Sequence, residues 1–299
     1  MHDRQRETSM FARLAALNKP FSWRYTVAIR KFVDVDGITI ETMESTGSGT
    51  PIFLVHGNSG SAQFFFDLLV SDFGKRRKLV AISLPGHGKS DASSTPETAY
   101  SIPGIGHFIV NFLKPYAHAP YWIIAQSLGA HAVMERLDSL SGLSGFISIS
   151  APPISLQTLS QAFQPDPSDG LLFKGPLSVA EAKRLAREFV ERKENAGLIS
   201  TEMLKTDPLF RQHLGMSLGR GEVLDEIRTF LNARCPVAFF HGAKDRFIHS
   251  GYYDSFPAHA AFPKKPVQFK NCGHALHLDD PVSFVCEVER FMQAVEPVR

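Results

Sequence analysis

Trp122-Ile123-Ile124-Ala125-Gln126-Ser127-Leu128-Gly129-Ala130-His131 is the stretch on which the prediction of the fold rests. Its first half is apolar and rich in aromatic and β-branched residues, which predicts a buried strand, and residues 131–137 can form a helix. Ser127 stands between the two elements. The small residues Ala125 and Gly129 lie two positions away on either side, where a bulky side chain would collide with a neighbouring element. Such a strand–serine–helix turn is sharp and pushes the serine hydroxyl above the sheet, which predicts a nucleophile if the rest of the chain agrees.

The length and composition are those of an ordinary globular protein. The chain has 299 residues, of which 43% are hydrophobic and 21% charged, so it can bury a full core. A net charge of +2 gives no reason to expect nucleic acid or an anionic membrane surface as a partner. No apolar run approaches the roughly 20 residues that span a bilayer. We therefore predict no nucleic-acid partner and no membrane span, and the oligomeric state is left open.

Cysteine usage and the N-terminal residues bear on the compartment. An odd number of cysteines without a CxxC pair argues against a disulfide framework and a zinc site, and favours a reducing compartment. The cysteines are Cys235, Cys272 and Cys286. The apolar residues 10–17 are interrupted by Arg13 and lack a small-residue cleavage site, so no signal peptide is predicted. We expect a cytoplasmic protein in which residues 1–28 form an N-terminal arm, with a short helix that Pro20 ends.

Alternating strand and helix signals predict a mainly parallel, doubly wound sheet with right-handed crossovers. An antiparallel hairpin about Asp36-Gly37 comes first, then a loop over residues 45–50 and the wholly apolar run Pro51-Ile52-Phe53-Leu54-Val55. The other predicted strands cover residues 30–35, 38–43, 79–82, 122–126, 146–149, 237–240 and 267–269. The predicted helices include one over residues 64–73, one over residues 103–113 and a closing helix with Asp280 as its N-cap and Pro281 at its first position.

This alternation stops between residues 153 and 234, where no buried strand is predicted. The segment contains an amphipathic helix over residues 178–194, whose apolar face we expect to hold Val179, Ala182, Ala186 and Phe189. Shorter helices are predicted over residues 199–204, 208–218 and 223–231. A helical insertion of this size in an α/β sheet is typical of a cap. We therefore expect a core formed by residues 29–152 and 235–299, covered by a helical cap formed by residues 153–234.

Polar candidates follow the predicted strands in the order Ser127, Asp245, His274. Since ligands of open α/β sheets bind beyond the carboxyl ends of the strands, we expect these side chains to meet there. Ser127 would attack an acyl carbon, His274 would accept its proton and return it to the leaving group, and Asp245 would hold the imidazole in the required tautomer. The backbone N–H groups of Asn58 and Leu128 would stabilise the oxyanion.

Other histidines are weaker candidates for the catalytic base. His277 lies three residues after His274 and is expected near the edge of the pocket, whereas His274 directly follows Gly273 at a strand end. His56 and His87 are expected to brace loops through hydrogen bonds rather than to transfer protons.

Other carboxylates are weaker candidates for the acid, and the motifs for a metal or a phosphate ligand are incomplete. Asp279 and Asp280 are explained by helix capping, and residues 148–153 contain no carboxylate, which favours Asp245 as the acid. The histidines form no HxxxH or HxH pair, so no metal site is predicted. Residues 86–90 lack the full spacing of a phosphate-binding loop. No cofactor is therefore expected.

Several motifs, taken in chain order, resemble those of the α/β-hydrolase superfamily. They are His56-Gly57-Asn58, Leu84-Pro85-Gly86-His87-Gly88-Lys89-Ser90, Gln126-Ser127-Leu128-Gly129, His241-Gly242-Ala243-Lys244-Asp245, and Gly273-His274 with Asp279-Asp280-Pro281. The resemblance covers residues 30–295 and implies the α/β-hydrolase fold with its Ser–Asp–His triad. The chain departs from the usual motifs at Ser83, where relatives carry Asp, and at Gln126 and Ala130 beside the serine.

Within the superfamily, the loop over residues 56–60, the Ala151-Pro152-Pro153 segment and the cap length resemble serine-dependent N-acyl-homoserine lactonases, the quorum-quenching branch. The resemblance implies a serine hydrolase that cleaves a carboxylic ester or lactone through an acyl-enzyme, with an N-acyl-homoserine lactone as the candidate substrate. A substrate with an apolar acyl part would fit a cap that supplies Phe163, Leu171, Leu172, Phe173, Met203, Phe210, Leu214 and Met216.

Two other functions stay open at this point. A carbon–carbon bond hydrolase of a vinylogous diketone would use the same triad, and turnover of such a ketone without turnover of esters would indicate it. A non-catalytic small-molecule receptor would use the same fold, and tight binding that is unchanged in Ser127→Ala would indicate that role. Epoxide and haloalkane hydrolases are disfavoured, because those relatives carry Asp where Ser127 stands.

Overall fold

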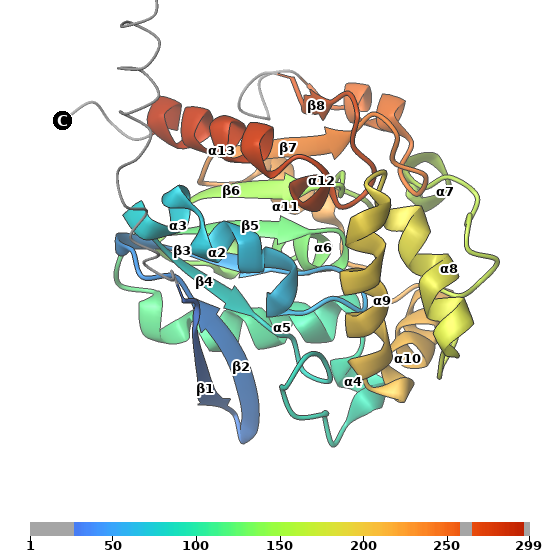
Figure 1. Ribbon diagram of the computed structural model, residues 1–299. Coiled ribbons are helices and arrows are strands. Elements are labelled where there is room, and N and C mark those ends of the chain that lie inside the picture. The colour runs from blue at the N-terminus through green and yellow to red at the C-terminus, as the bar shows by residue number, and fades with distance from the viewer. Residues whose placement is uncertain (1–26, 258–264, 296–299) are drawn as a thin grey trace, which may run out of the picture.

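A single eight-stranded sheet forms the centre of the computed structural model, which describes residues 27–257 and 265–295 (Figure 1). The strand order is β1-β2-β4-β3-β5-β6-β7-β8. The strands are β1 (Ile29–Val35), β2 (Ile38–Glu44), β3 (Ser48–Val55), β4 (Arg77–Ile82), β5 (Tyr121–Gln126), β6 (Leu143–Ile149), β7 (Val237–Gly242) and β8 (Val267–Phe269). Neighbouring strands from β4 to β8 are parallel, and β2 is antiparallel to both β1 and β4. The predicted mainly parallel, doubly wound sheet is confirmed.

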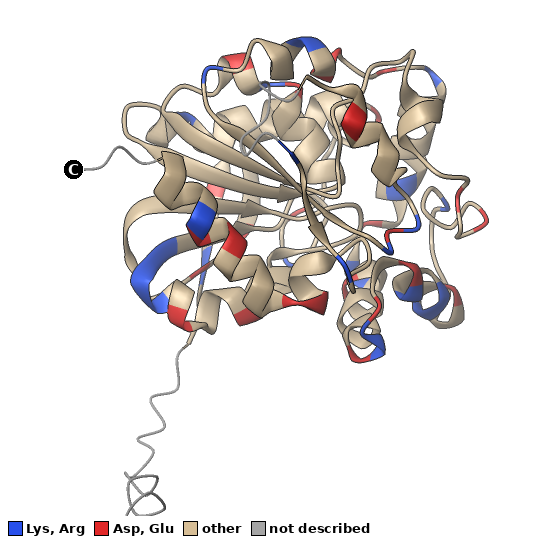
Figure 2. Cartoon of the chain, turned by 90° about the horizontal axis from the view of Figure 1, so that it is seen from above, with Lys and Arg blue, Asp and Glu red and all other residues tan. Residues whose placement is uncertain are grey.

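Helices lie on both faces of the sheet (Figure 2). They include α2 (Phe66–Val70), α3 (Asp72–Arg76), α4 (Pro96–Ala99), α5 (Ile102–Leu113), α6 (Leu128–Met134), α12 (Leu276–Asp279) and α13 (Pro281–Val295), with 3₁₀ turns η1 (Ala62–Phe65), η2 (Lys114–Tyr116), η3 (Leu137–Ser139) and η5 (Ser250–Ser255). Among the described residues, none of the helices is long and apolar enough to cross a bilayer. The predicted N-terminal helix, like most of the arm over residues 1–28, lies outside the described residues.

The N-terminal hairpin forms as predicted, with β1 and β2 paired from Ile29 opposite Glu44 to Val35 opposite Ile38. Asp36 and Gly37 both have positive φ, 54° and 83°, as the tight two-residue turn of a hairpin requires. The predicted loop over residues 45–50 is too long, because Ser48 already pairs with Arg77 and a register shift follows before Ile52.

The single helix predicted over residues 64–73 is wrong, because the chain there forms η1, α2 and α3 in succession. Ser71 causes the last break. Its backbone is extended (φ −68°, ψ 171°), and its hydroxyl accepts the N–H of Gly74 as the N-cap of α3. A serine that bonds local backbone groups competes with a continuous helix, although the apolar periodicity on either side is undisturbed.

The core lies between the sheet and its helices, and the central strand β5 is buried along its whole length. The Phe53 ring on β3 meets Phe112, Tyr116 and Tyr121 edge-on, with ring centroids 6.0, 4.8 and 5.7 Å away. Burying an aromatic or aliphatic side chain of this size contributes about 1.5–3 kcal/mol. The core therefore holds the carboxyl ends of β3, β5, β7 and β8 in fixed relative positions, and the candidate site is built at these ends.

The helices α7 (Leu159–Ala162), α8 (Val179–Phe189), α9 (Ala196–Lys205), α10 (Pro208–Gly219) and α11 (Glu226–Leu231) follow β6 and precede β7, with the turn η4 (Lys193–Asn195) between α8 and α9. Figure 1 shows α8, α9 and α10 beyond the ends to which the strand arrows point. Among the described residues of this segment, the only pairing of strand type is the bridge between Phe163 and Ile248. The division of the chain into a core and a cap stays a prediction.

Helix α8 is shorter than predicted, since Val190 has extended backbone (φ −134°, ψ 149°). Ser178 and Glu181 form a capping box at its start. The buried face is Ala182, Leu185, Ala186 and Phe189. Val179 does not belong to that face. It is 56% exposed, because it lies at the first helical position, where the helix end extends beyond the core. Helix α11 begins three residues later than predicted, because the Asp225 carboxylate accepts the N–H of Arg228 as its N-cap.

Candidate active site

Ser127 lies at the turn from β5 to α6, as its sequence context predicts. Its φ of 49° and ψ of −121° are strained for a residue with a side chain. The turn is held by the Ser127 N–H, which donates to the Ile149 carbonyl at 2.8 Å. At Gly129 an added Cβ would lie 2.4 Å from the His56 carbonyl oxygen, so only glycine lets the helix start this close to the neighbouring loop.

His274 and Asp245 form a buried hydrogen-bonded pair, with Nδ1 of the ring 2.8 Å from Oδ2 of the carboxylate. The other carboxylate oxygen, Oδ1, accepts the backbone N–H groups of Phe247 at 2.9 Å and Ile248 at 3.3 Å. The rings of Phe189 and Phe247 contact the imidazole edge-on, with centroids 5.3 and 4.9 Å away. A carboxylate only accepts, so Nδ1 carries the proton, and Nε2 is left as the atom that can take another.

Ser127 and His274 line one cavity of about 680 Å³, and Asp245 lies behind His274. No hydrogen bond joins the Ser127 hydroxyl to the His274 ring among the described residues. The walls of the cavity are mainly apolar and include Ile102, Ile154, Leu159, Phe163, Leu172, Phe173, Phe189, Leu214, Leu218 and Phe247. Of the residues that were expected to supply an apolar cap, Phe163, Leu172, Phe173 and Leu214 line the cavity. Leu171, Met203 and Phe210 are buried elsewhere in the core, and Met216 is exposed.

The backbone N–H groups of Asn58 and Leu128 have no hydrogen-bond acceptor among the described residues, and both residues line the cavity. The loop before Asn58 comes close to the serine, because a Cβ on Gly57 would lie 3.0 Å from the Ser127 Cβ. Two free donors beside a serine hydroxyl form the arrangement that stabilises an oxyanion.

The Asn58 side chain is occupied by structural hydrogen bonds. Its Nδ2 donates to the Leu172 carbonyl at 3.0 Å, and its Oδ1 accepts from the Ser59 hydroxyl at 2.7 Å. Ser59 in turn accepts Nη1 of Arg211, which is 2% exposed and also donates to the carbonyls of Lys174 and Gly175. Burial lowers the Arg211 pKa to about 10. This link between α10 and the Asn58 loop has no signal in the sequence.

His56 and His87 brace loops, as predicted. The Leu84 N–H donates to His56 Nε2 at 3.0 Å, and His56 Nδ1 lies 2.7 Å from the Gly57 carbonyl. His87 Nδ1 lies 3.0 Å from the Pro85 carbonyl. Burial lowers the pKa of His56 to about 4 and holds that of His87 well below its usual range, so both rings are neutral.

His277 does not lie at the edge of the cavity, and this prediction is wrong. Its ring stacks on Phe65, with centroids 5.0 Å apart, and both ring nitrogens are buried without a hydrogen-bond partner among the described residues. Burial lowers its pKa to about 3. The ring points away because α12 begins at Leu276 and turns the following side chain toward the core.

Asp279 does not cap a helix, and this prediction is also wrong. Its carboxylate accepts the backbone N–H groups of Gly273 at 2.8 Å, Glu191 at 3.0 Å and Arg192 at 3.0 Å. It therefore ties the loop before His274 to the end of α8. Asp280 alone is the predicted cap, and its Oδ1 accepts the Ser283 N–H at 3.0 Å.

Ser83, the departure from the usual aspartate, is compensated by a carboxylate from another strand. Its hydroxyl donates to Glu41 Oε2 at 2.8 Å and accepts the Ala62 N–H at 3.0 Å. Glu41 lies on β2 and also pairs with Arg30 at 2.7 Å. The serine and the glutamate together supply the acceptors that this loop needs.

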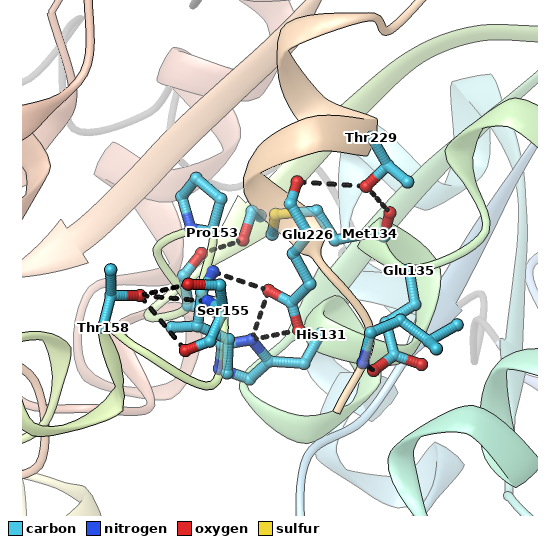
Figure 3. A network of polar contacts seen from close by, with 12 residues as sticks. His131, Met134, Glu135, Pro153, Ser155, Thr158, Glu226 and Thr229 are labelled. Atoms are coloured by element: carbon cyan, nitrogen blue, oxygen red, sulfur yellow. Dashed lines mark hydrogen bonds and ion pairs between the residues drawn. The ribbon is translucent and has the colours of Figure 1, made fainter. Parts of the chain in front are cut away.

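A buried polar network that the sequence analysis did not identify lies beside the cavity (Figure 3). His131 Nδ1 is 2.9 Å from Glu226 Oε2, which also accepts the Ile154 N–H at 3.1 Å. Glu135, one turn further along α6, accepts the Leu224 N–H at 2.7 Å through Oε1, and its Oε2 is buried without a partner. Burial raises the pKa of Glu226, and it raises that of Glu135 to about 7. The bonded residues of this network are 95 positions apart (His131 and Glu226) and 89 positions apart (Glu135 and Leu224), so no local sequence pattern predicts it.

We expect Glu135→Gln to increase the free energy of unfolding at pH 8 by about 3 kcal/mol and to leave it nearly unchanged at pH 4. The folded-state pKa of about 7 lies above the value of 4.5 for an unburied glutamate, so the wild type loses stability as pH rises through this window. Glutamine stays neutral and keeps the oxygen that accepts the Leu224 N–H. Urea unfolding of both proteins at several pH values measures the difference. The exposed Glu97→Gln is the control, and a pH-independent difference would contradict the prediction.

Among the described residues, no group of three or more His, Cys, Asp or Glu side chains is arranged to hold a metal ion. Cys235, Cys272 and Cys286 are free thiols.

Comparison with known proteins agrees with this architecture. Residues 52–288 match the model of a family described as "Alpha/beta hydrolase family". An uncharacterized protein of Mycobacterium tuberculosis, Rv2715, is 26% identical over 278 residues, covering 84% of this chain and 77% of that protein.

Two solved structures share the fold. A mutant of the N-acyl homoserine lactonase AidH, in complex with N-hexanoyl homoserine lactone, superposes with a TM-score of 0.82 at 24% identity, over 91% of this chain and 100% of that chain. A putative aryl esterase from Burkholderia cenocepacia superposes with a TM-score of 0.75 at 15% identity, over 89% of this chain and 99% of that chain. At these identities the likeness concerns the fold.

Proposed function

Because the chain belongs to the α/β-hydrolase family, we propose that it is a serine hydrolase that cleaves a carboxylic ester or lactone through an acyl-enzyme. The observation that carries the proposal is Ser127 on its strained turn, in one cavity with a histidine whose Nδ1 is bonded to Asp245. These are the groups that acyl transfer needs, namely a nucleophile, a base and a residue that orients the base.

In the proposed mechanism the Ser127 hydroxyl attacks the acyl carbon while His274 Nε2 takes the hydroxyl proton. Asp245 keeps the other ring proton on Nδ1 and stabilises the imidazolium. The negative charge on the substrate oxygen is stabilised by the free N–H groups of Asn58 and Leu128, each typically worth about 3–4 kcal/mol of the barrier. His274 then protonates the leaving alkoxide. Water, deprotonated by His274, hydrolyses the acyl-enzyme and restores Ser127.

The proposed substrate carries an apolar acyl chain, because the cavity beyond Ser127 is lined mainly by aliphatic and aromatic side chains. A volume of about 680 Å³ suits a small molecule rather than a polymer. The fold shared with AidH, a lactonase solved with N-hexanoyl homoserine lactone, makes N-acyl-homoserine lactones the substrates to test first, and quorum quenching the corresponding role. The free cysteines support the proposal that the enzyme acts in the cytoplasm.

The experiment is proton release from a series of N-acyl-homoserine lactones of increasing chain length, with an aryl ester of an equivalent acyl group alongside. We expect turnover of the lactones, with kcat/KM rising with chain length until the cavity is filled. Turnover of the aryl ester alone would replace the lactonase proposal with a general esterase. Failure of both, with turnover of a vinylogous diketone, would make the enzyme a carbon–carbon bond hydrolase. Binding without any turnover would make it a receptor.

A further inference from the structure

His131, which lines the proposed substrate cavity, forms a second histidine–carboxylate pair with Glu226, which lies behind it (Figure 3). His131 follows Ser127 by four residues on α6, which is about one helical turn, or 6 Å of rise, along the helix. Its Nδ1 lies 2.9 and 3.1 Å from the two carboxylate oxygens of Glu226. Glu226 is completely buried. This pair is separate from His274 and Asp245, and the proposed mechanism does not use it.

The second ring nitrogen of His131, Nε2, is available to a ligand. It has no hydrogen-bond partner among the described residues, and it is not sealed from solvent. His131 lines the cavity, and its Nδ1 is turned to the buried Glu226, so we infer that the accessible Nε2 on the other side of the ring faces the cavity. The cavity walls offer mostly apolar contacts. The polar lining residues Ser160, Asp166 and His249 are exposed at its rim, and the half-buried Gln164 uses its side-chain NH₂ group to donate to the carbonyls of Asp245 and Ile248 at 2.9 Å. His131 therefore gives the buried part of the wall a polar atom away from the candidate catalytic groups.

The protonation of the pair follows from its burial. Besides the ring, the Glu226 carboxyl group accepts a single N–H, that of Ile154. A buried carboxylate with so few donors is costly unless its charge is balanced. The pair carries no net charge when it holds two protons, one between Glu226 and His131 Nδ1 and one on the ring. In that state the ring carries its other proton on Nε2, whichever partner holds the shared one. Nε2–H is then a hydrogen-bond donor directed at the ligand.

We propose that His131 is a specificity-determining residue whose Nε2–H donates to an oxygen substituent on the acyl chain of the substrate. The inference rests on the proposed function and narrows it from apolar acyl chains to oxo- or hydroxy-substituted ones. When a substrate with an unsubstituted acyl chain is bound, the Nε2–H has no acceptor and is shielded from water. The missing hydrogen bond weakens the binding of that substrate. One such hydrogen bond corresponds to about a tenfold preference in kcat/KM.

The experiment compares kcat/KM for three N-acyl-homoserine lactones of equal chain length, which are unsubstituted, 3-oxo and 3-hydroxy. We expect the wild type to favour both oxygenated substrates by about tenfold. His131→Leu is expected to bring both ratios to about one, mainly by raising KM for the oxygenated substrates. His131→Leu/Glu226→Gln removes the buried charge while keeping an acceptor for the Ile154 N–H, so it tests the same ratio in a neutral background if the single variant does not fold. His118→Leu, at an exposed position outside the cavity, is the matched control and should keep the wild-type ratios.

The outcomes separate this inference from the proposed function. Equal wild-type kcat/KM for all three lactones, or an equal loss for all three in His131→Leu, would overturn it and leave His131 a structural residue. If the wild type hydrolyses none of them, the lactonase proposal fails. In that case calorimetry tests the inference, by measuring the affinities of the wild type and of His131→Leu for the three compounds. A preference for the oxygenated compounds that disappears in His131→Leu supports it, and equal affinities contradict it.

Discussion

Ser127→Ala is expected to lower kcat for the best lactone or ester by about a millionfold while leaving the protein folded. The change removes the atom that is proposed to form the acyl-enzyme, and the residues that position it stay in place. The Ser127 N–H still donates to the Ile149 carbonyl, and the helix α6 still starts against the His56 carbonyl at Gly129. The residual rate would come from the oxyanion donors and from binding alone.

The measurement is steady-state turnover, with mass spectrometry of the wild type quenched during reaction to detect the acyl adduct on Ser127. Ser139→Ala, the same chemical change at an exposed position, is the control and should be as active as the wild type. Activity of Ser127→Ala within a hundredfold of the wild type would show that another group is the nucleophile and would remove the basis of the proposed mechanism.

Asp245→Asn is expected to lower kcat by about ten-thousandfold, for a reason that the hydrogen bonds around it specify. Asp245 Oδ1 accepts the N–H groups of Phe247 and Ile248, so an asparagine at this position keeps its oxygen there. Its NH₂ group then takes the place of Oδ2 and donates to His274 Nδ1. The ring is forced into the tautomer with its proton on Nε2, which cannot accept the proton of Ser127.

Asp245→Asn is expected to be slow because His274 is held in the wrong tautomer. Part of the lost rate should therefore return at high pH, where hydroxide can act as the base in place of His274. The pH profile of kcat measures this, and Asp138→Asn at an exposed position is the control. A loss smaller than tenfold would mean that Asp245 is not the residue that orients His274.

The sequence predicts those features that depend on local pattern. Most of the buried strands are continuous apolar runs, so the mainly parallel sheet follows from them. The positions of Ser127 and Asp245 follow from their places beyond two of these runs, and that of His274 from its place beyond the short strand β8. Local side-chain hydrogen bonds alter the helices, as at Ser71, because a single serine can stop a helix without changing the apolar periodicity.

The sequence does not predict features that depend on distant partners. Asp279 has the spacing of a cap, but the N–H groups that it accepts include those of Glu191 and Arg192, more than 80 positions away. His277 has the polarity of a site residue, but its ring is buried against Phe65. The His131–Glu226 pair joins residues 95 positions apart, and each looks ordinary in its own segment.

The bonds that hold the helices of residues 153–234 to the strand-end loops have a kinetic consequence. Arg211 donates to Ser59, Asn58 to the Leu172 carbonyl, Ser61 to Glu202 at 2.7 Å, and the Asp207 N–H to the Gly86 carbonyl at 2.7 Å. At about 1 kcal/mol each, these four bonds alone cost about 4 kcal/mol to break, so a conformer with the helices lifted away is populated by at most about one molecule in a thousand. Product that waited for this conformer would leave at least about a thousandfold more slowly than product that diffuses past the exposed Phe173 and His249. Rotation of such side chains takes nanoseconds, so the rim is the exit that supports fast turnover.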